Sequence, residues 1–164
     1  MNTMTSLEQF ITNNGLSASL IEHPTPVRTV EEALQILQCS SDNIIKSLLV
    51  KAQFDGFSDF FLVLVQGDRR IHTKKLKMAL NAKDVKLASP QEVKSTTKYN
   101  IGDVPPISVP IPTIVDERIL MKESVYAGGG APNKNIHLLT KEMIELIHPL
   151  IGDVSKPIKK EEKK

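Results

Sequence analysis

The spacing of apolar residues along the chain predicts five helices, because positions three or four apart lie on one face of a helix. The clearest begins at Thr29, where Glu32 three places on completes the pattern of a capping box ahead of an apolar face. Ser89 and Glu92 repeat this pattern around a proline at the first helical position, and we expect a short helix that ends near Lys94. The predicted helices cover residues 6–14, 29–38, 73–80, 90–94 and 140–147.

Runs rich in β-branched and aromatic residues predict strands between these helices. The two longest, 44–52 and 60–66, are expected to form a buried pair joined by a loop around Asp55-Gly56. Residues 68–70 are predicted to turn, and four prolines between 99 and 112 exclude helix there, so we expect an ordered loop. Shorter strands are predicted at 17–22, 85–88, 114–116, 124–127 and 136–139.

Length and composition favour one domain of the α/β class. The chain has 164 residues, 40% of them apolar, which is enough for one substantial core and short for two. Only 4% are aromatic and tryptophan is absent, so the core depends on aliphatic side chains that pack well between a sheet and helices. We place the folded domain at residues 1–154 and expect the lysine-rich segment 155–164 to be a flexible tail.

Charge and sequence signals narrow the classes of partner. Basic side chains number 21 against 19 acidic ones, and a net charge of +2 does not indicate binding of nucleic acid over the whole surface. Contact with RNA would have to be local, at the basic cluster in 69–77 or in the tail, for which a solvated terminus is the alternative. With no signal peptide and no apolar run near the roughly 20 residues of a membrane span, we expect a cytoplasmic protein without membrane contact.

Several familiar catalytic arrangements do not occur in the sequence. The four histidines lack the spacing of a zinc site, and the lone Cys39 can form neither an internal disulfide nor a cysteine cluster, so we expect no metal and no cofactor. No serine lies in a GxSxG elbow, which disfavours a covalent hydrolase. An esterase with this sequence would position its substrate and a water, with backbone donors that stabilise the oxyanion.

Lys46 stands out as the one charge in the apolar run 44–50. Because a buried ammonium without a partner is costly, its presence there needs a reason. It either extends from a sheet edge to solvent or projects into a cleft to hold a phosphate or a polar substrate end.

Two glycine-containing segments are further candidates. In Gly102-Asp103-Val104-Pro105-Pro106 the glycine lets backbone N–H groups face outward while the prolines fix the loop, although many such loops only connect strands. The run 128–130 is all glycine and lacks the spacing of nucleotide-binding motifs, so packing or close approach of a substrate explains it better.

Taken in order, these segments resemble the YbaK/prolyl-tRNA-synthetase-associated editing family across about residues 5–147. The match lies in the order and spacing of six segments, namely 29–33, 45–50, 65–70, 87–93, 102–106 and 114–116. The resemblance implies a mixed, curved β-sheet flanked by helices, with a cleft for the aminoacylated 3′ end of tRNA.

The resemblance also implies roles for individual residues. Lys46 corresponds to the family's strand lysine, which is thought to contact the terminal nucleotide or the aminoacyl group. The segment from Gly102 to Pro106 corresponds to the family's GxxxP loop, whose backbone amides orient the ester carbonyl while a ribose hydroxyl or a water assists. Lys46 and Gly102 are thus implied to be catalytic. Substrate-binding roles are implied for Ser47, Asp103, Val104, Pro105, Pro106, Asp116, Gly128, Gly129 and Gly130.

The activity implied by the resemblance is trans-editing, the hydrolysis of the ester of a misacylated tRNA. Cysteine, alanine or a similar small amino acid on tRNA(Pro) or a related tRNA would be the substrate, prolyl-tRNA synthetase a partner, and a monomer or weak homodimer the functional state. Asp103 stands where many relatives have a second glycine, and Ala131 follows the glycine run where some alanine-specific members carry histidine. The alternative hypothesis is a non-catalytic module that retains the fold and binds tRNA or a synthetase.

Overall fold

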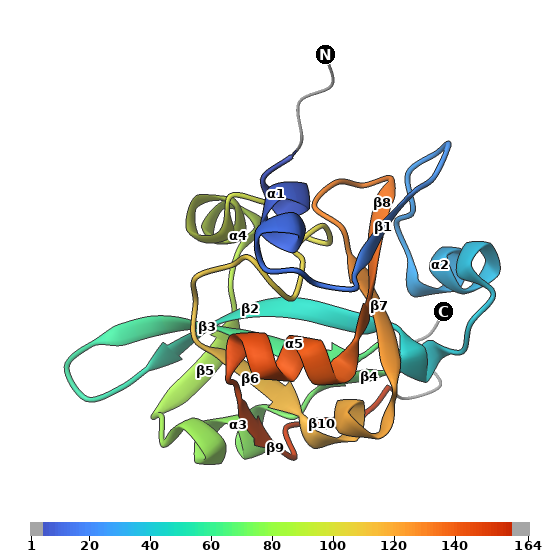
Figure 1. The fold of residues 1–164 in the computed structure, drawn as a ribbon. Helices are drawn as coiled ribbons and strands as arrows, with labels where there is room; N and C mark the ends of the chain where they lie inside the picture. Colours follow the sequence, from blue (N-terminus) through green and yellow to red (C-terminus); the bar gives the residue numbers. More distant parts are fainter. Residues whose placement is uncertain (1–4, 159–164) are drawn as a thin grey trace.

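The structure, a computed structural model, describes residues 5–158. Within this range five α-helices lie where the sequence predicts them, together with two short 3-10 helices (Figure 1). The α-helices are α1 (Ser6–Asn13), α2 (Val30–Leu37), α3 (Thr73–Leu80), α4 (Pro90–Thr97) and α5 (Thr140–Ile147); the 3-10 helices are η1 (Ser41–Asn43) and η2 (Glu117–Met121).

Helix ends account for two departures from the predictions. The box at Ser89 is complete, but α4 continues to Thr97, because Val93 and Thr97 are buried and the Thr97 hydroxyl donates to Val93 O at 2.7 Å. At α2, Thr29 accepts the N–H of Glu32, whereas the Glu32 carboxylate accepts the N–H of Arg28 and so does not close the predicted box.

The strands form one mixed sheet and two smaller antiparallel ones. The main sheet has the order β5-β2-β3-β6-β9, in which β2 pairs antiparallel with β3 and β5, while β3–β6 and β6–β9 are parallel. The second sheet is β1-β8-β7, and a bridge between Ile44 and Tyr126 links it to the start of β2. The strands are β1 (Ser19–Glu22), β2 (Ile45–Gln53), β3 (Ser58–Gln66), β4 (Arg69–Ile71), β5 (Asp84–Leu87), β6 (Thr113–Asp116), β7 (Ser124–Gly128), β8 (Lys134–Leu139), β9 (Leu150–Gly152) and β10 (Ser155–Pro157).

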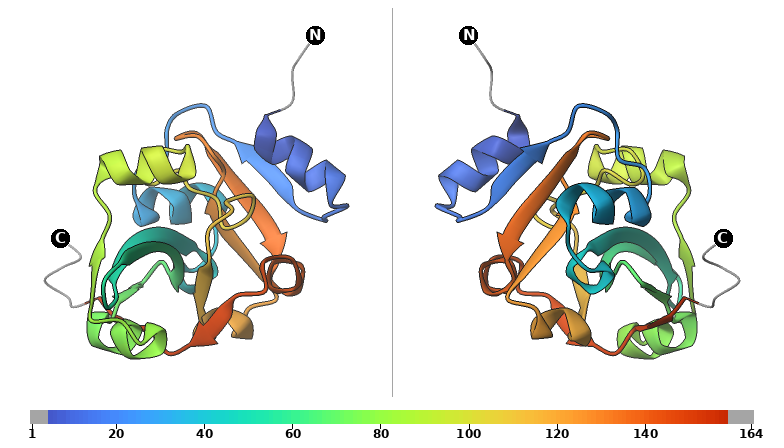
Figure 2. Two further views of the ribbon diagram at one scale, coloured as in Figure 1. Left: turned by 90° about the vertical axis from the view of Figure 1, so that its left-hand side faces the viewer. Right: turned by 90° about the vertical axis from the view of Figure 1, so that its right-hand side faces the viewer.

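The main sheet has a hydrophobic core on each face, because side chains alternate along its strands. On one face Ile45 and Leu49 of β2 pack in a cluster with Leu7 of α1, Val93 of α4 and Met143 of α5. On the other face Val50 and Ala52 of β2 pack with Leu76 of α3. The side views show the sheet curving between these two layers, with α3 on the opposite side from α1 and α4 (Figure 2).

The C-terminal boundary predicted at residue 154 is too early. Ser155–Pro157 forms β10, which pairs antiparallel with β4, and Arg69 of β4 donates to both the hydroxyl and the carbonyl of Ser155. The predicted turn at 68–70 is likewise a strand from Arg69 onward. The predicted tail beyond residue 158 lies outside the described residues.

Candidate functional site

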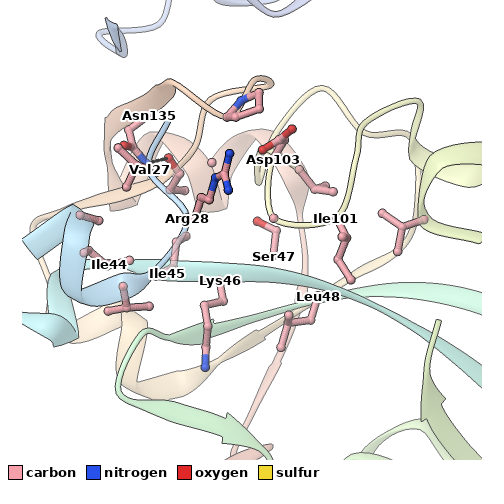
Figure 3. A pocket seen from close by; sticks show the side chains of 18 of the residues that line it. Val27, Arg28, Ile44, Ile45, Lys46, Ser47, Leu48, Ile101, Asp103 and Asn135 are labelled. Carbon is pink, nitrogen blue, oxygen red and sulfur yellow. Dashed lines mark hydrogen bonds between the residues drawn. The ribbon is translucent and has the colours of Figure 1, made fainter. Parts of the chain in front are cut away.

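A pocket of about 310 Å³ opens on the face of the main sheet that carries α4 (Figure 3). Five parts of the chain enclose it: β2, the end of β5 with α4, the segment that leads into α2 with the start of that helix, the loop after α4, and the β7–β8 hairpin at its turn. Its lining residues include Arg28, Ile45, Ser47, Leu49, Gly102, Asp103, Val104, Ala127, Gly128 and Asn135. Segments far apart in the sequence therefore converge on one cavity.

The loop after α4 is held in a shape that leaves backbone donors unused. Gly102 has φ of 90°, a conformation that side chains disfavour, and Asp103 N–H donates to Asn100 O at 3.0 Å. Within residues 5–158 the N–H groups of Gly102 and Val104 have no hydrogen-bond partner. Burial of Val104, Pro105 and Pro106 fixes the loop against the body of the protein. Unpaired N–H groups beside a pocket can bind a carbonyl oxygen or an oxyanion.

The glycine turn presses directly against this loop. A Cβ on Gly128 would lie 2.8 Å from Val104 O, and the Gly130 N–H donates to Asp103 O at 2.9 Å. A Cβ on Gly129 would lie 2.7 Å from the carbonyl carbon of Lys134, within the same hairpin. Gly128 lines the pocket, whereas Gly129 and Gly130 do not. The run thus permits close approach of hairpin and loop.

The segment before α2 forms the wall opposite the loop. Val27 N–H donates to Pro132 O at 2.8 Å, and His23 Nε2 lies 2.8 Å from Asn135 Oδ1, so this segment is fastened to the β7–β8 turn. Arg28 extends into the pocket region from it (Figure 3). The sequence prediction missed Arg28 and Asn135, and its nearest signal was the helix cap at Thr29, directly after Arg28.

Ser47 and Lys46 project from opposite faces of β2. The Ser47 hydroxyl points toward the pocket, and its oxygen is buried with no hydrogen-bond partner among the described residues (Figure 3). The Lys46 ammonium points the other way and donates to the backbone carbonyl of Arg69. Burial, with a further contribution from Arg70, lowers the pKa of Lys46, and Asp68 opposes this shift. The structure therefore brings Ser47, but not the Lys46 ammonium, into the pocket.

Lys46 instead borders a second cavity, of about 300 Å³, on the other face of β2. Arg70 and Lys86 also line it, over an apolar floor that includes Leu76. Three residues, Lys46, Leu48 and Leu87, line both cavities, so the two are adjacent.

Asp103 places a carboxyl group at the pocket. The residue is 9% exposed, and its carboxyl group has no hydrogen bond or ion pair within the described part of the chain. Burial raises the pKa of Asp103, and the charge of Lys94 partly offsets this effect.

Asp116, predicted at the substrate, is not among the lining residues of the pocket. It is fully buried at the end of β6, where its carboxylate accepts the N–H groups of Arg118 and Val154 and the guanidinium of Arg118. These hydrogen bonds give Asp116 a structural role, and that role is enough to explain a carboxylate at this position. Pro105, Pro106, Gly129 and Gly130 are likewise absent from the lining of the pocket.

Residues 5–158 contain neither a metal-binding cluster nor a membrane-spanning helix. No group of three or more His, Cys, Asp or Glu side chains there is arranged to hold a metal ion. No helix in that range has the length and apolar character needed to cross a membrane.

Comparison with known proteins identifies the family. A family model described as the aminoacyl-tRNA editing domain matches residues 24–146. The chain belongs to this family. The editing domain match confirms the resemblance inferred from the six segments, and it includes every predicted site residue.

Curated relatives of this editing domain are proline–tRNA ligases. That of Pseudothermotoga lettingae is 34% identical over 108 residues, covering 65% of this chain and 18% of the ligase. That of Desulfotalea psychrophila is 30% identical over 127 residues, covering 77% of this chain and 21% of the ligase. The chain thus spans about a fifth of the length of the ligases that it matches.

Solved structures share the fold of this editing domain over nearly its full length. The hypothetical protein APE2540 is 32% identical with a TM-score of 0.85, covering 93% of this chain and 100% of its own. A candidate trans-editing enzyme for prolyl tRNA synthetase is 27% identical with a TM-score of 0.82, covering 94% and 99% of the two chains. The predicted mixed α/β fold is confirmed.

Proposed function

We propose that this protein is a deacylase that hydrolyses the ester between a small amino acid and the 3′ end of a misacylated tRNA. The observation that carries the proposal is the pocket beside the unpaired N–H groups of Gly102 and Val104. Its volume lies at the small end of ligand sites, which suits a short aminoacyl group such as alanine or cysteine. The proline–tRNA ligase relatives suggest tRNA(Pro) or a related tRNA as the carrier.

In the proposed reaction a water attacks the carbonyl carbon of the ester. Negative charge develops on the carbonyl oxygen, where the N–H groups of Gly102 and Val104 would stabilise it. The bond between the carbonyl carbon and the ribose oxygen then breaks, and the ribose oxygen takes a proton. The products are the free amino acid and a tRNA with an intact terminal hydroxyl. The protein's contribution is to orient the ester and to supply fixed dipoles.

The cationic cavity across β2 suits the nucleic acid part of the substrate. Lys46 and Lys86 line it, and Leu48 and Leu87 join it to the pocket. We place the phosphate or ribose of the terminal nucleotide there, with its ester reaching around the end of β5 into the pocket. In this arrangement Lys46 binds tRNA and does not touch the reacting carbonyl.

Single-turnover hydrolysis of tRNAs that carry Ala, Cys, Ser, Thr or Pro tests the proposal. We expect release of one or two of these amino acids well above the uncatalysed rate. A Gly102→Ala variant, whose backbone would be strained at a φ of 90°, should lose most of this activity while still binding tRNA. Absence of hydrolysis across the whole panel would refute the deacylase.

The competing function is a non-catalytic module that binds tRNA or prolyl-tRNA synthetase. The observation that favours it is the Asp103 carboxyl beside the pocket, since a negative charge there repels phosphate. This module would bind aminoacylated tRNA without consuming it. The same panel separates the two functions when binding is measured alongside release.

A further inference from the structure

The carboxyl group of Asp103 is largely buried and has no bonding partner among the described residues. The residue is 9% exposed, and its carboxyl group has no ion pair or hydrogen bond within residues 5–158. Unlike the Ser47 oxygen, its carboxylate oxygens are not fully buried, and the residue lines the pocket. A carboxylate kept unpaired beside a cavity is therefore available to a ligand.

A second polar group in the same pocket is also unused. The Ser47 oxygen is buried and has no hydrogen-bond partner among the described residues. Ser47 on the floor and Asp103 on the loop both point into the pocket, as Figure 3 shows. Much of the remaining wall is aliphatic, from Ile45, Leu49 and Ala127. Within the described residues the pocket thus offers two unpaired oxygen acceptors beside this aliphatic wall, while Arg28 and Lys134 supply positive charge elsewhere in its lining.

We propose that the Asp103 carboxylate and the Ser47 hydroxyl bind the α-ammonium group of the aminoacyl moiety, while the aliphatic wall receives its side chain. This inference rests on the proposed deacylase function. An ammonium group has three N–H donors and a positive charge, so it satisfies both oxygens, and charged hydrogen bonds are the stronger kind. A phosphate would meet repulsion from Asp103.

The proposal predicts a requirement for a particular functional group on the substrate, which the size of the pocket alone would not predict. The protein should require a free, positively charged α-amino group. Lactyl-tRNA is the matched probe, because it differs from alanyl-tRNA only in a neutral hydroxyl in place of the α-ammonium. If alanine is not the amino acid released in the panel, the hydroxy analogue of the preferred one takes its place.

The test compares single-turnover rates on these two substrates, each corrected for uncatalysed hydrolysis. Wild type should prefer the ammonium substrate by about ten-fold or more, the effect expected of a charged hydrogen bond. Asp103→Asn should lose this preference through a slower rate on alanyl-tRNA, with the rate on lactyl-tRNA little changed, and Ser47→Ala should lose part of it. Asp84→Asn removes an exposed carboxylate on β5 and should behave as wild type.

The outcomes separate this inference from the function on which it rests. Equal rates of wild type on both substrates, or an undiminished preference in Asp103→Asn, would overturn the role of Asp103 while the deacylase stands. Faster hydrolysis of both substrates by Asp103→Asn would also overturn it, since the carboxylate would then only repel tRNA. Hydrolysis of neither substrate would remove the deacylase and the inference together. Asp103→Gly gives a second variant in case the Asn variant does not fold.

Discussion

The contact between the glycine turn and the loop gives a sharp test of how the pocket is built. In Gly128→Ala the new methyl carbon would lie 2.8 Å from Val104 O and 3.0 Å from the carbonyl carbon of Asp103. Both neighbours are backbone atoms, which cannot rotate away as a flexible side chain can. The loop must therefore separate from the hairpin, and the hydrogen bond from Gly130 N–H to Asp103 O is weakened or lost.

The expected cost combines two effects. Overpacking of a tight site costs about 1–3 kcal/mol, and a lost hydrogen bond adds about 1 kcal/mol. We expect Gly128→Ala to lower the free energy of unfolding by about 2–4 kcal/mol, or Tm by about 5–15 °C for a domain of this size. The hydrolysis rate should also fall, even under conditions in which the variant is fully folded, because the displaced loop carries the N–H groups of Gly102 and Val104.

Urea denaturation of Gly128→Ala measures this cost, with Gly152→Ala as the matched control. A Cβ on Gly152 meets nothing within 4 Å, so the control should stay close to wild type. If Gly128→Ala is as stable as the control and equally active, the turn and the loop are not held together as described, and the explanation of the glycine run is wrong.

Three other substitutions test separate parts of the argument. Because burial raises the pKa of Asp103 in the folded state, the folded protein binds that proton more tightly; Asp103→Asn should therefore be more stable than wild type at neutral pH. Thermal melts across pH should show that gain vanish as the pH falls below about 3.9, the ordinary pKa of the unfolded carboxyl. Lys46→Ala should weaken tRNA binding and flatten its dependence on salt, with a smaller effect on the single-turnover rate at saturation; a complete loss of turnover with unchanged binding would contradict the outward position of the ammonium. Asp116→Ala leaves the Val154 N–H and the Arg118 donors without their acceptor, and should cost about 3 kcal/mol or more in chemical denaturation, whereas a loss of activity without loss of stability would restore a role at the substrate.

Much of the fold could be predicted because local signals agreed with the tertiary structure. Apolar spacing located α3 at Thr73–Leu80, and the Asn-Gly stop placed the end of α1 within a residue. The length of α4 was underestimated because Ser95, Thr96 and Thr97 are weak helix formers, and burial of Thr97 against the core overrides that tendency. Strand β10 was missed because its pairing with β4 joins residues about 86 positions apart, which no local pattern records.

The candidate site was predictable in its segments but not in the directions of its side chains. The loop, the glycine turn and β2 do meet at one pocket. The side of β2 that Lys46 occupies depends on which face α3 and α4 cover, and this is settled by packing across the whole sheet. No motif indicates that Arg28 reaches the pocket, since its position follows from the hydrogen bond that the neighbouring Val27 N–H donates to Pro132 O in the β7–β8 turn.

The alternation of side chains along β2 assigns ligand preference and overall affinity to different residues of one strand. Ser47 and Leu49 face one cavity, while Lys46 and Val50 face the other. Substitutions at Ser47 or Leu49 therefore change the pocket beside the loop, and substitutions that remove the Lys46 ammonium or the Val50 side chain change the cationic cavity, while Leu48 borders both. A change of preferred ligand and a change of overall affinity can thus accumulate independently along one strand, as long as its register with β3 is kept.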